Sequence, residues 1–188
     1  MQNWKKQLPM WITMSRIFAA IPIIALLFPD RVILNVIAAV LFILASISDY
    51  YDGYFARKFN AISNMGKFMD PIADKILVTS VLVMMIPTKR IDPVMVTILL
   101  VRDTLIGGIR SVAAADQIII AAKPAGKWKT ALQMVAIPAV MIGDVLWGIP
   151  FDRIGYYVLW VSVVLSVTSG IEYTYEYLKS RKSAVRDT

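Results

Sequence analysis

Six long apolar segments, separated by short polar or proline-containing stretches, make up almost the whole chain. Each segment is close to the ~20 residues that a helix needs to cross about 30 Å of hydrocarbon. Five prolines fall at or near the breaks, where a helix loses least by them: Pro29, Pro87, Pro93, Pro124 and Pro150. The pattern predicts six transmembrane helices, with approximate bounds 9–28, 32–56, 67–87, 93–115, 130–149 and 154–178.

The composition agrees with an all-α integral membrane protein. Hydrophobic residues make up 58% of the 188 residues and the mean hydropathy is +0.64, more apolar than a soluble domain of this length. The connections are too short for a separate soluble domain, so we expect residues 1–188 to form a single transmembrane domain. The basic and aromatic residues before Pro9 are compatible with a short N-terminal interfacial helix. The long apolar run after Trp11 is not typical of a cleavable signal peptide.

Lys and Arg residues are distributed unequally between the two sides of the predicted membrane. The termini and the connections 57–67 and 123–129 hold twelve of the twenty, whereas the opposite connections hold four. The positive-inside rule therefore places both termini in the cytoplasm of a multi-pass protein of the cytoplasmic (inner) membrane. The net charge of +7 suits an anionic leaflet and anionic substrates, and it requires no nucleic-acid partner.

Four aspartates, at the ends of two apolar segments, form the main candidate for a catalytic site. Asp49 and Asp52 are three residues apart and Asp70 and Asp74 are four apart, so each pair lies on one face of a helix. Carboxylates are costly in such segments, and buried pairs with Lys or Arg seldom stabilise a fold, so two divalent cations are the more economical partner. Pro71 fits the first turn of the third helix, with Asp70 as its N-cap.

Cysteine and histidine are both absent from the chain. Their absence excludes disulfides, thiol nucleophiles, Cys/His zinc sites and imidazole bases. A general base would therefore have to be a carboxylate or, less readily, a Lys or Tyr side chain. A motif carboxylate is the first candidate.

The four aspartates belong to the pattern D-x2-D-G-x2-A-R-x8-G-x3-D-x3-D, which runs from Asp49 to Asp74. It resembles the signature of the CDP-alcohol phosphatidyltransferases at every fixed position, and the likeness extends to most of the chain through the number of spans and the loop charges. The resemblance implies a six-helix membrane enzyme, usually a homodimer, in which an alcohol displaces CMP from a CDP-linked lipid with the help of two divalent ions, Mg²⁺ or Mn²⁺. It implies that Asp49, Asp52 and Asp70 bind metal, and that Asp74 binds metal and also takes the alcohol proton.

The same resemblance implies that other motif residues contact the CDP-lipid. Gly53 and Ala56 have almost no side chain, so a phosphate or another helix can approach closely. Arg57 can bind a phosphate through its planar guanidinium. Ser63, in the connection within the motif, is a further candidate for a hydrogen bond to the nucleotide, or else an ordinary loop serine.

A second element near the N-terminus is also expected to bind the CDP-lipid. Thr13 and Arg16 match the Asn-x-x-Thr-x-x-Arg element of many bacterial family members, whereas Met10 stands where those members have Asn. The structural alternative for Arg16 is that its side chain extends to the membrane interface.

Basic residues elsewhere are candidates for binding the phosphate of an acceptor alcohol. Arg102 and Arg110 are eight residues apart and share a helix face, which is typical of a polar cavity, although internal ion pairing is the alternative. Asp103 is offset from them and could pair with a basic group. Many members of the family that make phosphatidylglycerophosphate have Glu at this position. The full candidate set is Lys75, Arg102, Arg110, Lys127 and Lys129.

Three features favour family members that make phosphatidylglycerophosphate from CDP-diacylglycerol and sn-glycerol 3-phosphate. They are Asp-Pro-Ile-Ala-Asp-Lys at 70–75, Gly-Lys-x-Lys-Thr at 126–130, and the basic groups available for a phosphorylated acceptor. The nearest alternative acceptors are inositol phosphate and phosphatidylglycerol. A divalent-cation transporter is an alternative of another class, but transporters tend to place such groups at mid-bilayer on repeated, broken helices. Here the cluster lies towards the cytoplasmic face, and the later half holds no second copy.

Overall fold

A computed structural model of the protein describes residues 3–58, 64–116, 118, 124–143 and 148–186. Within these residues every regular element is a helix, which confirms the predicted all-α fold. The helices are α1 (Asn3–Leu27), α2 (Val32–Lys58), α3 (Asn64–Met85), α4 (Pro93–Ala115), α5 (Pro124–Ile142) and α6 (Phe151–Arg186). The start of α4 has a clear local cause, because Pro93 occupies its first position and the Asp92 carboxylate accepts a hydrogen bond from the Val94 amide at 2.8 Å.

Some helix bounds differ from the prediction, and α5 is shifted as a whole, from the expected 130–149 to Pro124–Ile142. The N-terminal stretch is not a separate interfacial helix, because α1 runs without a break from Asn3 to Leu27. Helix α3 begins at Asn64, so Asp70 is not its N-cap and Pro71 lies in the helix interior. The expected cap was wrong because a proline removes the backbone hydrogen bond of its own nitrogen without necessarily ending a helix.

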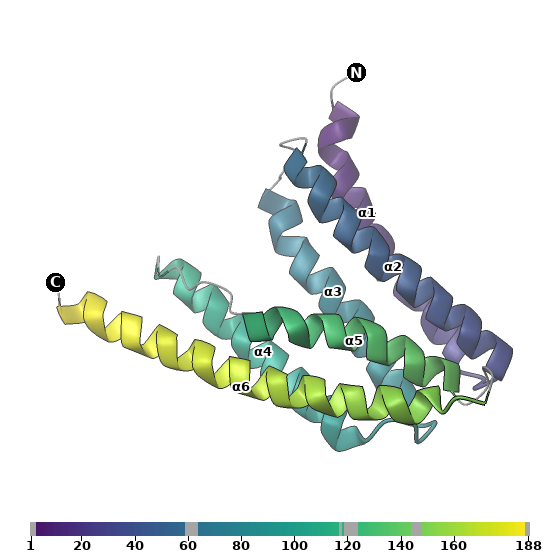
Figure 1. The fold of residues 1–188 in the computed structure, drawn as a ribbon. Coiled ribbons are helices and arrows are strands. Elements are labelled where there is room, and N and C mark those ends of the chain that lie inside the picture. The colour runs from purple at the N-terminus through teal and green to yellow at the C-terminus, as the bar shows by residue number, and fades with distance from the viewer. Residues whose placement is uncertain (1–2, 59–63, 117, 119–123, 144–147, 187–188) are drawn as a thin grey trace.

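The six helices form two groups of three that diverge from a common end (Figure 1). Helix α1 packs against both α2 and α3, while α6 packs against both α5 and α4. Contacts between α2 and α5 join the two groups, and α3 touches α4 at only a few points. The groups lie close together at the end that carries the α1–α2 and α5–α6 connections, and they separate towards the two termini.

The apolar core is continuous and draws on every helix. One almost fully buried residue from each, in chain order, is Ile23, Phe42, Leu77, Met95, Ile137 and Leu159. At the end where the groups meet, Arg90 contacts Asp30 at 2.9 Å and donates to the Met141 carbonyl at 3.0 Å. These contacts tie the α1–α2 connection and the end of α5 to the segment that precedes α4.

The outer surface of the helices is strongly apolar. Large hydrophobic side chains are exposed on every helix, for example Phe18, Ile33, Val83, Leu105, Val135 and Ile171. Among the described residues, Phe151–Lys182 is the one stretch long and apolar enough to cross a membrane, and shorter apolar stretches lie in α1, α2 and α3. A surface of this kind is typical of contact with lipid or another apolar partner, since soluble monomers rarely expose such large apolar areas.

Candidate functional site

The aspartate motif is carried by the end of α2 and the beginning of α3. Asp49 and Asp52 lie on α2, and Asp70 and Asp74 lie on α3. Asp52 is six residues before the end of α2 at Lys58, and Asp70 is six residues after the start of α3 at Asn64. These two helix ends lie at the same end of the molecule (Figure 1). The two pairs of aspartates therefore lie at a similar distance from that end.

The backbone placement fits a site shared by the two pairs. Both α2 and α3 pack against α1, so their backbones are fixed relative to one another through a common neighbour. Four carboxylates from two helices are the hard oxygen donors that Mg²⁺ and Mn²⁺ prefer. The side chains of these aspartates, and of Gly53, Ala56 and Arg57 on α2, lie outside the described residues. Their ligand roles stay predictions.

The residues predicted at the N-terminal end fall partly within the described set. Arg16 lies on α1 and is only 2% exposed, so it is directed into the protein and does not extend to an outer surface. Thr13 is also on α1, but its side chain is outside the described residues, as is the whole of Ser63. A buried guanidinium on the helix that contacts both α2 and α3 is compatible with the expected role of Arg16 in binding a phosphate.

A polar cavity of about 330 Å³ lies between α4, α5 and α6. It brings together three of the five residues predicted to bind the acceptor phosphate: Arg102, Arg110 and Lys127. The two arginines therefore share a face and line one cavity, as their spacing predicts. The other lining residues are Ile106, Gly126, Thr130, Ser169, Tyr173 and Glu176.

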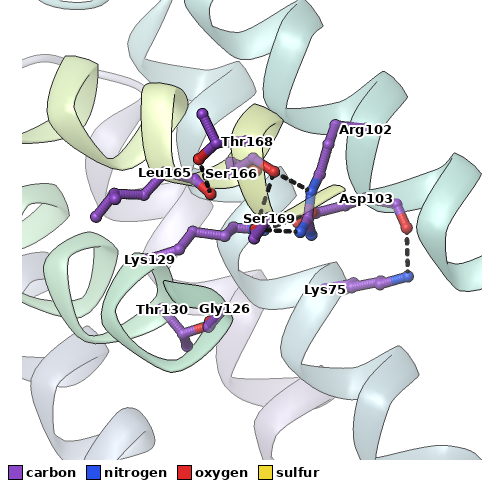
Figure 2. A network of polar contacts seen from close by, with 10 residues as sticks. All are labelled: Lys75, Arg102, Asp103, Gly126, Lys129, Thr130, Leu165, Ser166, Thr168 and Ser169. Atoms are coloured by element: carbon purple, nitrogen blue, oxygen red, sulfur yellow. Dashed lines mark hydrogen bonds and ion pairs between the residues drawn. The ribbon is translucent and has the colours of Figure 1, made fainter. Parts of the chain in front are cut away.

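The remaining two predicted cations meet Arg102 at a single residue, Asp103 (Figure 2). One carboxylate oxygen of Asp103 accepts hydrogen bonds from Arg102 Nη1 at 2.9 Å and from Lys129 Nζ. Its backbone carbonyl accepts a hydrogen bond from Lys75 Nζ at 2.9 Å. Lys129 is only 5% exposed. A lysine is buried to this extent almost only when it has a charged partner, which here is Asp103. The predicted pairing of Asp103 with a basic group is confirmed, and it involves two of them.

Helix α6 holds the other side of the Arg102 guanidinium. Nε donates to the Ser166 carbonyl at 2.7 Å, and Nη2 donates to the Ser169 hydroxyl at 2.8 Å. Gly170 leaves room for this approach, since a Cβ added there would lie 3.2 Å from Nε. Arg102 is thus fixed at three of its nitrogens while it still borders the cavity.

Arg110 is held differently. Its guanidinium carbon lies 5.3 Å from the centre of the Tyr173 ring, a cation–π contact between α4 and α6. The stacking orients the guanidinium without using its N–H donors. Those donors can therefore bind an anion in the cavity.

Comparison with known proteins agrees with the motif. The family model described as CDP-alcohol phosphatidyltransferase matches residues 6–168. The chain belongs to this family. It is therefore an enzyme, a phosphatidyltransferase of phospholipid synthesis.

Several similar members of the family carry the name CDP-diacylglycerol–glycerol-3-phosphate 3-phosphatidyltransferase. The protein of that name from Rickettsia typhi is 35% identical over 179 residues, which cover 95% of this chain and 98% of the relative. The one from Rickettsia bellii is 36% identical over 179 residues, covering 94% and 96%. The one from Bacillus subtilis is 38% identical over 139 residues, covering 72% of this chain and 70% of the relative.

Sequence reasoning missed the residues of α6 that border the cavity of this phosphatidyltransferase. Ser166, Ser169, Tyr173 and Glu176 were not predicted as site residues, yet the last three line the cavity and Ser166 holds Arg102. Their spacing of three, four and three residues puts them on one stripe of an otherwise apolar helix. That stripe of polar side chains was the signal that could have found them.

Proposed function

We propose that this phosphatidyltransferase moves the phosphatidyl group of CDP-diacylglycerol to sn-glycerol 3-phosphate, forming phosphatidylglycerophosphate and CMP. The observation that carries the proposal is the basic cavity between α4, α5 and α6. Arg102, Arg110 and Lys127 line a volume that suits a small phosphorylated alcohol. Lys75, which donates to the backbone carbonyl of Asp103, directly follows the expected catalytic residue Asp74 in the sequence. The names of the related proteins support the same acceptor.

The aspartate motif would bind the CDP part of the donor. Asp49, Asp52, Asp70 and Asp74 are the residues that would hold two divalent ions, Mg²⁺ or Mn²⁺, which supply positive charge to the pyrophosphate and to the departing CMP. Gly53 and Ala56 would allow the pyrophosphate to approach α2. Arg57, Arg16, Thr13 and Ser63 are the further residues proposed for the CDP-lipid.

The chemical step would be a single displacement at the phosphorus that bears the diacylglycerol. The hydroxyl oxygen of glycerol 3-phosphate forms the new P–O bond, the bond to CMP breaks, and CMP leaves with the electron pair. Asp74 accepts the hydroxyl proton, since the chain offers no histidine or cysteine for this role. The basic cavity holds the acceptor phosphate so that its hydroxyl points towards the motif.

The expected setting is the cytoplasmic membrane, with six spans and with the termini and the site on the cytoplasmic side. The charge distribution along the sequence and the apolar outer surface of the helices support it. A homodimer is part of the same proposal and rests on the family resemblance. The basic cavity favours a phosphorylated acceptor, either glycerol 3-phosphate or inositol phosphate, over phosphatidylglycerol, whose phosphate is already esterified at both ends.

A transfer assay with the purified full-length protein tests the proposal. The protein in detergent or nanodiscs is incubated with CDP-diacylglycerol, Mg²⁺ and, in separate reactions, radiolabelled glycerol 3-phosphate, inositol phosphate or phosphatidylglycerol. Label from glycerol 3-phosphate should enter lipid, with one CMP released for each lipid formed, and chelation of the metal should stop the reaction. Preferential labelling from either other acceptor would overturn the acceptor assignment, and magnesium-independent transfer would overturn the metal assignment.

A further inference from the structure

Asp103 occupies an unusual place relative to the basic cavity. It is not among the residues that line the cavity, yet it contacts three of the five cations that the sequence assigns to acceptor binding. Two of the three, Lys75 and Lys129, come from the neighbouring helices α3 and α5. Asp103 therefore joins α3, α4 and α5, and through Arg102 it is linked to α6 as well.

The hydrogen bonds around Asp103 leave a defined set of donors for a ligand. Within the part of the chain that the structure describes, Arg102 uses three N–H groups, which go to Asp103, the Ser166 carbonyl and Ser169. A guanidinium has five, so two remain at the border of the cavity. A side chain fixed on three sides loses little conformational freedom when it binds an anion, and this strengthens binding.

The local charge also has a clear consequence. The Asp103 carboxylate lies between the positive charges of Arg102 and Lys129 and lowers the repulsion between them. The residues that line the cavity carry the positive charges of Arg102, Arg110 and Lys127 against the single carboxylate of Glu176, which leaves an excess of two positive charges. That excess matches a phosphate monoester, which carries nearly two negative charges at neutral pH.

We propose that Asp103 is a positioning residue that gives the site its preference for a phosphorylated acceptor. It holds Arg102 and Lys129 with its carboxylate and Lys75 with its backbone carbonyl, and it does not itself touch the acceptor. The inference rests on the proposed function, because it assigns the basic cavity to the acceptor phosphate. It goes further by naming the residue that arranges the cations.

The decisive variant is Asp103→Asn, which removes the charge but keeps the size of the side chain and the backbone carbonyl. We expect the KM for glycerol 3-phosphate to rise by about tenfold or more, the scale of a weakened charge-assisted contact, while the KM for CDP-diacylglycerol stays within about twofold. Asp103→Glu restores the carboxylate and should recover most of the acceptor affinity. Should Asp103→Asn fail to fold, Asp103→Ser takes its place, since its hydroxyl is neutral and still accepts a hydrogen bond.

Asp116→Asn is the matched control. Asp116 is the C-cap residue of α4; it accepts a hydrogen bond from Tyr177 on α6 at 2.9 Å, and it does not line the cavity. It therefore reports the effect of losing an aspartate that links α4 to α6. We expect both KM values to remain at the wild-type level in this variant.

Calorimetric titration with inorganic phosphate separates this inference from the proposed function, because it needs no turnover. Asp103→Asn should weaken phosphate binding by about tenfold relative to the wild type and to Asp116→Asn. A wild type that binds phosphate but labels lipid from another acceptor would overturn the proposed function and leave the role of Asp103 intact. Unchanged phosphate affinity in Asp103→Asn, or the same loss in Asp103→Glu, would overturn the inference.

Discussion

Gly107 on α4 lies directly against the ammonium group of Lys75 on α3, so closely that a Cβ added at Gly107 would lie 2.7 Å from Nζ. The missing side chain is what lets Lys75 reach the Asp103 carbonyl one turn earlier on α4. Since α3 and α4 touch at only a few points, this contact is one of the few direct links between these two helices. The link lies next to Asp74 in the sequence.

Replacing Gly107 by Ala should therefore displace the Lys75 ammonium with little cost to folding, because the atom in the way is the end of a flexible side chain. We expect the KM for glycerol 3-phosphate to rise severalfold and the thermal midpoint to change little. Gly108→Ala is the matched control, since a Cβ there meets nothing within 4 Å. Equal KM values in the two variants would show that the position of Lys75 does not matter for the acceptor.

Arg110→Ala should weaken acceptor binding more than donor binding, because Arg110 lines the basic cavity and lies outside the aspartate motif. Loss of a charge-assisted phosphate contact is worth about 1.5–3 kcal/mol, or roughly ten- to a hundredfold in the KM for glycerol 3-phosphate. Steady-state kinetics with each substrate varied in turn measures it. An effect confined to the KM for CDP-diacylglycerol would assign Arg110 to the nucleotide side.

The Tyr173 ring should matter to this arginine, whereas its hydroxyl should not. Tyr173→Phe keeps the ring that Arg110 stacks on, so we expect nearly wild-type acceptor KM. Tyr173→Leu removes the ring and should raise the acceptor KM, by less than Arg110→Ala does. The idea fails if Phe and Leu have the same effect.

Replacing Asp49, Asp52 or Asp70 by Asn should abolish turnover while the protein still inserts into the membrane. Each change removes a negative charge from a cluster expected to hold two dications.

Asp74→Asn should lower kcat by at least about a hundredfold, the usual scale for a positioned base, with CDP-lipid still bound. Near-normal kcat in Asp74→Asn at saturating metal would rule out its role as the base.

The close approach of α5 and α6 should depend on Gly155. A Cβ added there would lie 2.8 Å from the Ala136 carbonyl oxygen and 2.9 Å from the Val140 nitrogen, both of them backbone atoms. Gly155→Ala should therefore force the helices apart and destabilise the protein by about 1–3 kcal/mol, the usual range for an overpacked core. A lower thermal midpoint than that of Gly108→Ala, measured in the same detergent, would support this account.

Stereochemistry at phosphorus tests the single displacement. A CDP-diacylglycerol made chiral at the phosphorus that bears the lipid should give product of inverted configuration, because one in-line displacement inverts that centre. Retention would require two displacements and a covalent phosphatidyl-enzyme. Exchange of labelled CMP into CDP-diacylglycerol without any acceptor alcohol would indicate the same intermediate.

Much of this protein could be read from the sequence because the signals are local. Apolar length and proline positions predicted six helices, five of which end or begin within a few residues of the expected places. The spacing of Arg102 and Arg110 predicted a shared face, and both line one cavity. The cap of α3 was missed because residues 64–70 already adopt helical backbone ahead of Pro71, whereas local pattern rules place that proline in a first turn.

The sequence by itself determined the helices, the faces on which charged residues lie, and the family to which the motif belongs. Only the tertiary structure decided the partners: Lys129 meets Asp103 across 26 residues of sequence, and Arg102 meets the Ser166 carbonyl across 64. The physical reason is that helical periodicity fixes which residues share a face, whereas the pairing of faces depends on how whole helices pack. That packing is the sum of many weak side-chain contacts spread over all six helices.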